Sequence, residues 1–70
     1  MKISARTTLK GTVKQIAPGA VNAEVTIELA GGQQVVSIIT QKSVADLGLA
    51  VGKTAYAVIK ASSVMIGIDH

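Results

Sequence analysis

Polar groups that could hold an anion stand at three places in the sequence, each where a predicted element begins or ends. Hydroxyls, cations and backbone N–H groups at these places make up the donor set that a tetrahedral oxyanion requires. Each place also has an ordinary explanation as surface cations or turn residues, and composition alone does not show that the three converge. The side chains are those of Ser4 and Arg6, Thr40 and Ser43, and Lys60 with Ser62.

The second of these places combines a helix cap with a hydroxyl one turn later. Thr40 follows a β-branched run and has the chemistry of an N-cap, and Ser43 stands at the third helical position. A helix that begins here leaves N–H groups without intrahelical partners, and its macrodipole adds about half a positive charge. Such a start can seat a small anion. For any single helix start, a capped surface helix that binds nothing is the commoner case.

Residues for catalysis or for a metal cation are scarce. There is no Cys, and the single histidine, His70, is the last residue of the sequence. Asp46 and Asp69 are isolated acids, and Glu24 and Glu28 share the polar face of an alternating strand, where solvation explains them. The sequence therefore predicts a protein that is not an enzyme, with no catalytic residues and no cation-binding metal site.

Size and composition predict one small domain, residues 1 to 70, that needs help to be stable. The chain is 49% apolar but has no Phe, no Trp and one Tyr, so its core must consist of Val, Ile, Leu and Ala. Without a disulfide or a structural metal, oligomerisation is the remaining common remedy. A net charge of +3 suits an anionic ligand. Neither a signal peptide nor a membrane span is recognisable, so we expect a cytoplasmic location.

Apolar patterning predicts three strands, a short helix and two more strands. The alternation of apolar positions along the first strand is interrupted at Ile16, which indicates a bulge or bend before the Pro18-Gly19 turn. The third strand and the helix meet at Thr40, and the helix of about seven residues runs to Leu47 with Gly48 as its C-terminal stop. The expected strands cover residues 4 to 18, 21 to 29, 35 to 39, 54 to 60 and 64 to 68.

This order predicts an all-β fold, a five-stranded Greek-key barrel of the oligonucleotide/oligosaccharide-binding (OB) type, with one short helix between strands three and four. The second strand alternates cleanly from Val21 to Leu29, with one face buried. The third and fourth strands carry apolar residues on both faces, which a half-exposed sheet rarely does. The surplus apolar face is most simply covered by another copy of the chain.

An oligonucleotide-binding role is the alternative that this fold suggests first. Barrels that bind single strands usually stack bases on aromatic side chains. Tyr56 is the only aromatic residue, and its place in a strand predicts that it is packed. We therefore expect no nucleic-acid partner.

Four stretches carry a resemblance by their order and spacing: Ile3-Ser4-Ala5-Arg6, Gly19-Ala20-Val21-Asn22-Ala23-Glu24-Val25, Ser37-Ile38-Ile39-Thr40 with Ser43, and Ala57-Val58-Ile59-Lys60-Ala61-Ser62-Ser63-Val64. With them the sequence resembles the molbindin family, small stand-alone proteins made of a single Mop domain. The similarity covers nearly all of the chain. One position departs from it, because Thr7 stands where the family usually has Asn, which affects only the local geometry.

The resemblance implies a cytoplasmic protein that binds molybdate or tungstate and stores or buffers it, without chemistry on the ligand and without another cofactor. It also implies a homohexamer, a trimer of dimers, with oxyanions held between subunits. The main site implied by the motif comprises Ser4, Ala5, Arg6, Lys60, Ala61 and Ser62, with Thr40 and Ser43 from a neighbouring subunit. A second site, near the threefold axis, is placed on Gly19, Ala20, Val21 and Asn22. A purely structural oligomerisation module remains an alternative.

Overall fold

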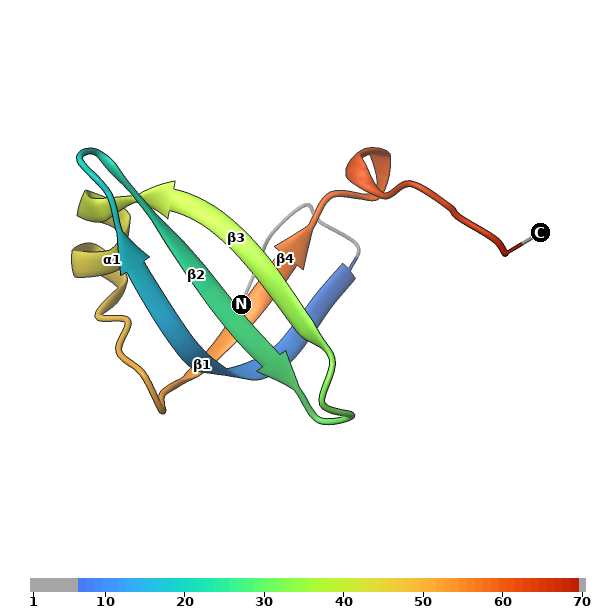
Figure 1. Ribbon diagram of the computed structural model, residues 1–70, viewed down its shortest axis with the longest axis horizontal. Coiled ribbons are helices and arrows are strands. Elements are labelled where there is room, and N and C mark those ends of the chain that lie inside the picture. The colour runs from blue at the N-terminus through green and yellow to red at the C-terminus, as the bar shows by residue number, and fades with distance from the viewer. Residues whose placement is uncertain (1–6, 70) are drawn as a thin grey trace.

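Four strands and one short helix make up the regular structure in residues 7 to 69, the part of the chain that the computed structural model describes (Figure 1). The strands form one antiparallel sheet in the order β3-β2-β1-β4, which curls strongly on itself. The helix α1 follows β3 and lies at one end of the sheet. The elements are β1 (Thr7–Pro18), β2 (Asn22–Leu29), β3 (Gln34–Thr40), α1 (Gln41–Leu47), β4 (Thr54–Ile59) and the 3-10 turn η1 (Ala61–Ser63).

A β-bulge in β1 confirms the predicted irregularity. Val13 pairs with Ile27, but the next residue of β2, Thr26, pairs with Gln15, so Lys14 is the extra residue. Such an insertion shifts the facing of every later side chain by one position and increases the local twist. This shift explains why Ile16 packs against the core although its parity differs from that of Val13.

The core is small and aliphatic, as the composition predicts. Val13 and Val25 are completely or almost completely buried, and Ile27 and Ala57 complete the central cluster. One predicted core residue is wrong: Val21 is 69% exposed, because β2 starts at Asn22 and Val21 belongs to the preceding turn. With so little buried volume, each core contact is a large share of the stability.

Gly11 of β1 has no room for a side chain beside β2. A Cβ there would be 2.4 Å from Cγ2 of Ile27 and 2.6 Å from the carbonyl oxygen of Glu28. Gly11→Ala should therefore destabilise the fold by about 1–3 kcal/mol, the usual cost of overpacking. Urea denaturation measures the change. Gly31→Ala is the matched control, because a Cβ at Gly31 meets nothing within 4 Å, and an equal loss in both variants would contradict the steric explanation.

The third and fourth strands have apolar residues on both faces, as predicted. Val35 and Ile39 point towards the core, whereas Val36 and Ile38 on the other face of β3 are exposed. On β4, Tyr56 and Val58 are likewise about half exposed. Tyr56 is thus less packed than predicted. A single tyrosine in the sequence still provides no series of stacking platforms.

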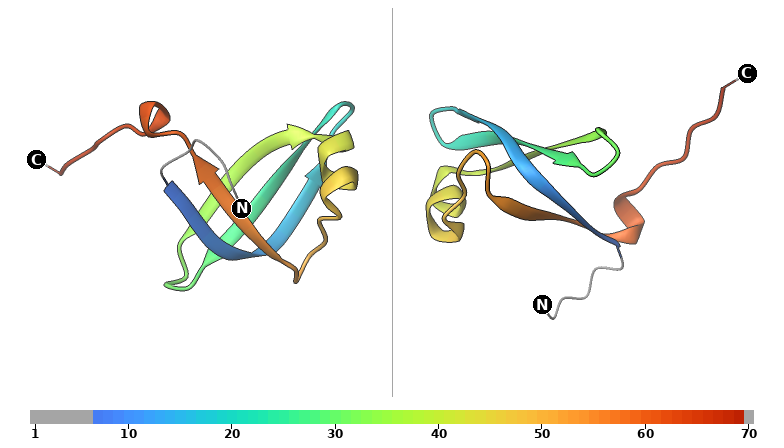
Figure 2. Two further views of the ribbon diagram at one scale, coloured as in Figure 1. Left: turned by 180° about the vertical axis from the view of Figure 1, so that it is seen from behind. Right: turned by 90° about the horizontal axis from the view of Figure 1, so that it is seen from below.

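The prediction of a fifth strand over residues 64 to 68 is not confirmed. These residues have no regular secondary structure and leave the sheet beyond η1, as the views of Figure 2 agree. Met65, Ile66 and Ile68 are each more than four-fifths exposed. A strand requires an adjacent edge for its backbone hydrogen bonds, and this segment meets none in a single copy of the described chain.

No helix in residues 7 to 69 is long and apolar enough to cross a membrane.

Candidate functional site

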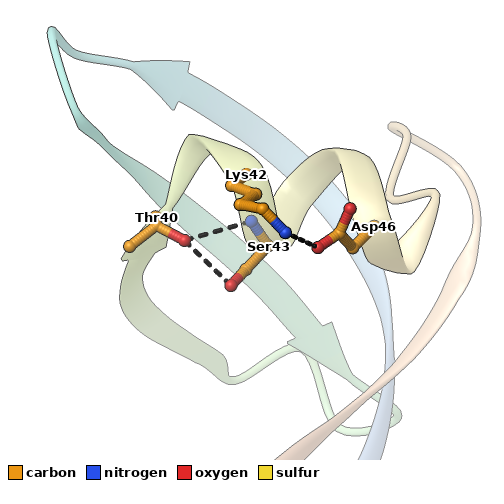
Figure 3. Close-up of polar contacts among 4 residues, drawn as sticks. All are labelled: Thr40, Lys42, Ser43 and Asp46. Atoms are coloured by element: carbon orange, nitrogen blue, oxygen red, sulfur yellow. Dashed lines mark hydrogen bonds and ion pairs between the residues drawn. The ribbon is translucent and has the colours of Figure 1, made fainter.

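The junction of β3 and α1 has the geometry predicted from its sequence (Figure 3). Thr40 is the N-cap, with an extended backbone, and its Oγ1 accepts a hydrogen bond of 3.0 Å from the N–H of Ser43. The Thr40 hydroxyl donates in turn to Oγ of Ser43 at 2.9 Å. Gly48 ends the helix with φ at 64°, as its predicted stop position requires.

Gln41 ties the helix start to the turn between β1 and β2. Its backbone N–H donates to the carbonyl of Val21 at 2.9 Å, and its side-chain Nε2 donates to the carbonyl of Gly19. The turn itself is closed by the N–H of Gly19, which donates to the carbonyl of Asn22 at 2.7 Å. Asn22 pairs with Thr40 in the β2–β3 register, so the two predicted anion sites are neighbours on one surface.

Several hydrogen-bond donors of this region have no partner within residues 7 to 69. The carbonyls of Gly19 and Val21 and Oγ1 of Thr40 each accept a bond, as described above. No acceptor within residues 7 to 69 takes the backbone N–H of Ala20, Val21 or Lys42. The hydroxyl hydrogen of Ser43 is also free to donate, since Ser43 Oγ is the acceptor in its bond with Thr40. The exposed surface therefore offers donors, the groups that a fully deprotonated anion requires.

The lysine at the helix start, Lys42, is paired with an acidic residue of the same helix. Nζ of Lys42 lies 2.9 Å from Oδ2 of Asp46 one turn later, and both side chains are well exposed (Figure 3). An exposed pair of this spacing is weak, about 0.3–0.5 kcal/mol. It nevertheless places a carboxylate beside the only lysine of α1, so Lys42 is not fully available to balance the charge of a dianion at this position.

Lys60, Ala61 and Ser62 lie at the opposite end of the molecule from the helix start. Lys60 precedes η1, and its carbonyl accepts from the N–H of Ser63 at 2.9 Å. Figures 1 and 2 show η1 and α1 at opposite ends of the sheet. A single copy therefore does not bring Lys60 to Thr40 and Ser43.

The remaining predicted site residues, Ser4, Ala5 and Arg6, lie outside the described residues. They directly precede Thr7 in the sequence, and Thr7 pairs with Ile59, next to Lys60. The beginning of β1 and the end of β4 are thus adjacent. Lys60 therefore directly follows the β4 residue that pairs with the first residue of β1.

Sequence reasoning missed Gln41, which links the helix start to the 19–22 turn. Its signal was weak, because a glutamine at the first helical position is common and its partners stand about twenty residues earlier. A hollow of about 650 Å³ is lined mostly by apolar side chains of β3 and β4 and does not include the helix start. No cluster of three His, Cys, Asp or Glu residues occurs in residues 7 to 69, where a metal cation could be held.

Comparisons with known proteins find one family model and several proteins named for binding molybdate or a molybdenum pterin. The model of the TOBE domain matches residues 3–66. A probable molybdenum-pterin-binding protein of Haemophilus influenzae is 52% identical over 69 residues, which cover 99% of this chain and 100% of the relative. The solved structure of a molybdate-binding protein from Sporomusa ovata is 40% identical, with a TM-score of 0.91 over 97% of this chain and all of that one. The cytoplasmic molybdate-binding protein ModG, solved with molybdate bound, is 54% identical with a TM-score of 0.94, and the match spans 99% of this chain and 49% of ModG.

Proposed function

Because the chain belongs to the TOBE-domain family, as a single Mop domain of the molbindin type, we propose that it binds molybdate or tungstate reversibly. The observation that carries the proposal is the donor-rich surface at the helix start. There the backbone N–H of Lys42 and the Ser43 hydroxyl have no acceptor within residues 7 to 69, while the carbonyl of Val21 and Oγ1 of Thr40 each accept a hydrogen bond. The related proteins are named for binding rather than for catalysis, which agrees with a ligand that leaves unchanged.

A site that offers only hydrogen-bond donors selects anions by their protonation state. Molybdate is a tetrahedral dianion at neutral pH, so each of its oxygens accepts hydrogen bonds and none donates. A singly protonated phosphate would set its own hydroxyl against another donor, which costs affinity. Sulfate carries no proton either, and its smaller size must therefore distinguish it, in a site that is too wide for good contacts.

The main site is proposed to form between copies of the chain. Thr40 and Ser43 of one copy supply hydroxyls and a capped helix start, and Lys60 of another copy supplies a positive charge. Two observations support this division: the two halves lie at opposite ends of one copy, and the local Lys42 is paired with Asp46. The full set proposed for this site is Ser4, Ala5, Arg6, Lys60, Ala61 and Ser62, with Thr40 and Ser43 from the neighbouring copy.

A second site is proposed on the turn formed by Gly19, Ala20, Val21 and Asn22. Two free backbone N–H groups, those of Ala20 and Val21, support it. Gln41 holds this turn against the helix start, so it is proposed to keep both sites in a fixed relation.

Assembly as a homohexamer, a trimer of dimers, would cover the exposed apolar residues of β3 and β4. Within this proposal the chain, one Mop domain over residues 1 to 70, stores or buffers the oxyanion in the cytoplasm. The match to ModG, described as a cytoplasmic molybdate-binding protein, supports that role. Elemental analysis of the protein purified from its native cell would identify the metal it carries.

Titration calorimetry with molybdate, tungstate and sulfate tests the proposal. Molybdate and tungstate should bind with dissociation constants in the micromolar range or below, because a few charge-assisted hydrogen bonds contribute about 1.5–3 kcal/mol each. Sulfate should bind at least about tenfold more weakly, equivalent to about 1.4 kcal/mol. Equal affinity for all three anions would contradict the proposed selectivity, and no heat with any of them would contradict the function.

A further inference from the structure

The turn between β1 and β2 lies beside α1 (Figure 1) and is closed by few bonds of its own. The N–H of Gly19 donates to the carbonyl of Asn22 at 2.7 Å, but the carbonyl of Gly19 accepts from the side chain of Gln41 rather than from the N–H of Asn22. Opposite residues at the end of an antiparallel pair often exchange both bonds. Gly19 also lacks a Cβ, so the peptide unit after it rotates more freely than after another residue. The orientation of this peptide unit is therefore fixed from outside the turn.

Gln41, the first residue of α1, holds two carbonyls of the turn. Its side-chain Nε2 donates to the carbonyl of Gly19, and its backbone N–H donates to the carbonyl of Val21 at 2.9 Å. The position of Gln41 is set by its neighbour, because Thr40 caps α1 and pairs with Asn22 in the sheet. Only the bond to Gly19 depends on the identity of the side chain at position 41.

This bond determines where a donor of the turn points. The peptide units of the described chain are trans, and in a planar trans unit the C=O and N–H bonds point in opposite directions. The carbonyl of Gly19 and the N–H of Ala20 belong to one such unit. Because the carbonyl is held by Gln41, the N–H of Ala20 points away from that side chain. This N–H and that of Val21 have no acceptor within residues 7 to 69. Gln41 thus orients a free donor that it does not contact.

We propose that the side chain of Gln41 is a positioning residue, which holds the peptide unit between Gly19 and Ala20 so that its N–H is ready to bind an anion. This inference rests on the second site of the proposed function and adds the residue that orients its donors. A donor that is already oriented binds without a further loss of backbone freedom, whereas a mobile turn loses that freedom on binding. Gln41 acts through the turn, since its own amide N–H group is engaged with Gly19.

Gln41→Met tests the ordering of the turn without any ligand. Methionine has a similar length and no donor, and the backbone N–H of residue 41 can still bond to Val21. Nitrogen-15 relaxation of the anion-free protein should give the Ala20 amide an order parameter of about 0.85 in the unaltered chain, and a lower one, towards about 0.6, in Gln41→Met. Gln34→Met is the matched control, because Gln34 is an exposed glutamine at the other end of β3. Equal order parameters in the unaltered chain and Gln41→Met would overturn the proposal.

Titration with molybdate, followed by the amide signals of single residues, tests the effect on binding. The Ala20 signal reports the turn and the Lys42 signal reports the helix start. Gln41→Met should weaken binding at the turn by about tenfold, as expected when about one residue must be ordered on binding, and should leave the affinity at the helix start unchanged. A general loss of structure would weaken both.

The outcomes separate this inference from the function on which it rests. An unchanged affinity at the turn in Gln41→Met, or an equal loss at the turn and the helix start, overturns the role of Gln41 alone. If the Ala20 signal of the unaltered chain does not respond to molybdate, the second site is contradicted and the role of Gln41 with it. If neither Ala20 nor Lys42 responds, the proposed function itself is contradicted.

Discussion

Molybdate at a hundred times its dissociation constant is expected to raise the melting temperature of this protein by about ten degrees or more. A ligand that binds only the folded state adds about 2.7 kcal/mol at that concentration. For a domain of this size, each kcal/mol corresponds to about 4–8 °C. The effect is large because the chain is short and its core contains no Phe or Trp, so little else supports it. Scanning calorimetry with and without molybdate, at constant ionic strength, measures the shift.

The same measurement separates the proposed function from a purely structural oligomerisation module. Exposed apolar residues on β3 and β4, such as Ile38 and Val58, fit either role, because both roles need a second copy of the chain. A module without an anion site should show the same melting temperature in molybdate, sulfate and chloride. A shift with molybdate that sulfate reproduces at equal concentration would instead indicate a general effect of dianions on a basic protein.

Local chemistry made the strands and the helix predictable. Alternation fixed the core face from Ala23 to Leu29, and Thr40 and Gly48 marked the ends of α1, because capping and turn preferences act over a few residues. The broken parity at Ile16 likewise indicated the bulge, although the extra residue, Lys14, stands two positions earlier. These features depend on residues that are close together in the sequence, so the sequence is sufficient to predict them.

Features that depend on distant partners were not predictable to the same degree. The apolar run of residues 64 to 68 has the composition of a strand, but a strand must also pair with a sheet edge, and within one copy this segment leaves the sheet without pairing with either edge strand. Val21 continued the alternation of β2, yet the turn, closed by Gly19 and Asn22, removes it from the sheet. Gln41 could not be recognised, because its acceptors become neighbours only when β1, β2 and β3 have paired.

The candidate site shows the same limit. Residue types predicted a capped helix start at Thr40 and Ser43, and the hydrogen bonds there confirm it. The anion site proposed at the same place stays a prediction. The relation of Thr40 and Ser43 to Lys60 follows from no local rule, since the fold places them at opposite ends of one copy. Only an assembly can join them, and the packing of copies is not encoded in any single stretch.

Lys60→Ala and Arg6→Ala are each expected to weaken molybdate binding by about ten- to a hundredfold. The reason is the loss of one charge-assisted hydrogen bond, worth about 1.5–3 kcal/mol, from a ligand with two negative charges. Arg6→Lys should retain more affinity than Arg6→Ala, because it keeps the charge and loses only the forked donor geometry. Calorimetry gives the affinities, and sedimentation shows whether the assembly persists. It should persist, since neither substitution alters the apolar faces of β3 and β4.

Lys53→Ala supplies the control for net charge. Lys53 directly precedes β4 and Lys60 directly follows it, so the two substitutions remove the same charge from opposite ends of one strand. If the site lies where the chain enters β1 and leaves β4, only Lys60→Ala should reduce affinity, and the effect should persist at higher salt, where long-range attraction is screened. Equal losses in Lys53→Ala and Lys60→Ala would mean that the lysines act through the overall field. Unchanged affinity in both Arg6→Ala and Lys60→Ala would remove these residues from the site and leave the helix start and the 19–22 turn to account for binding.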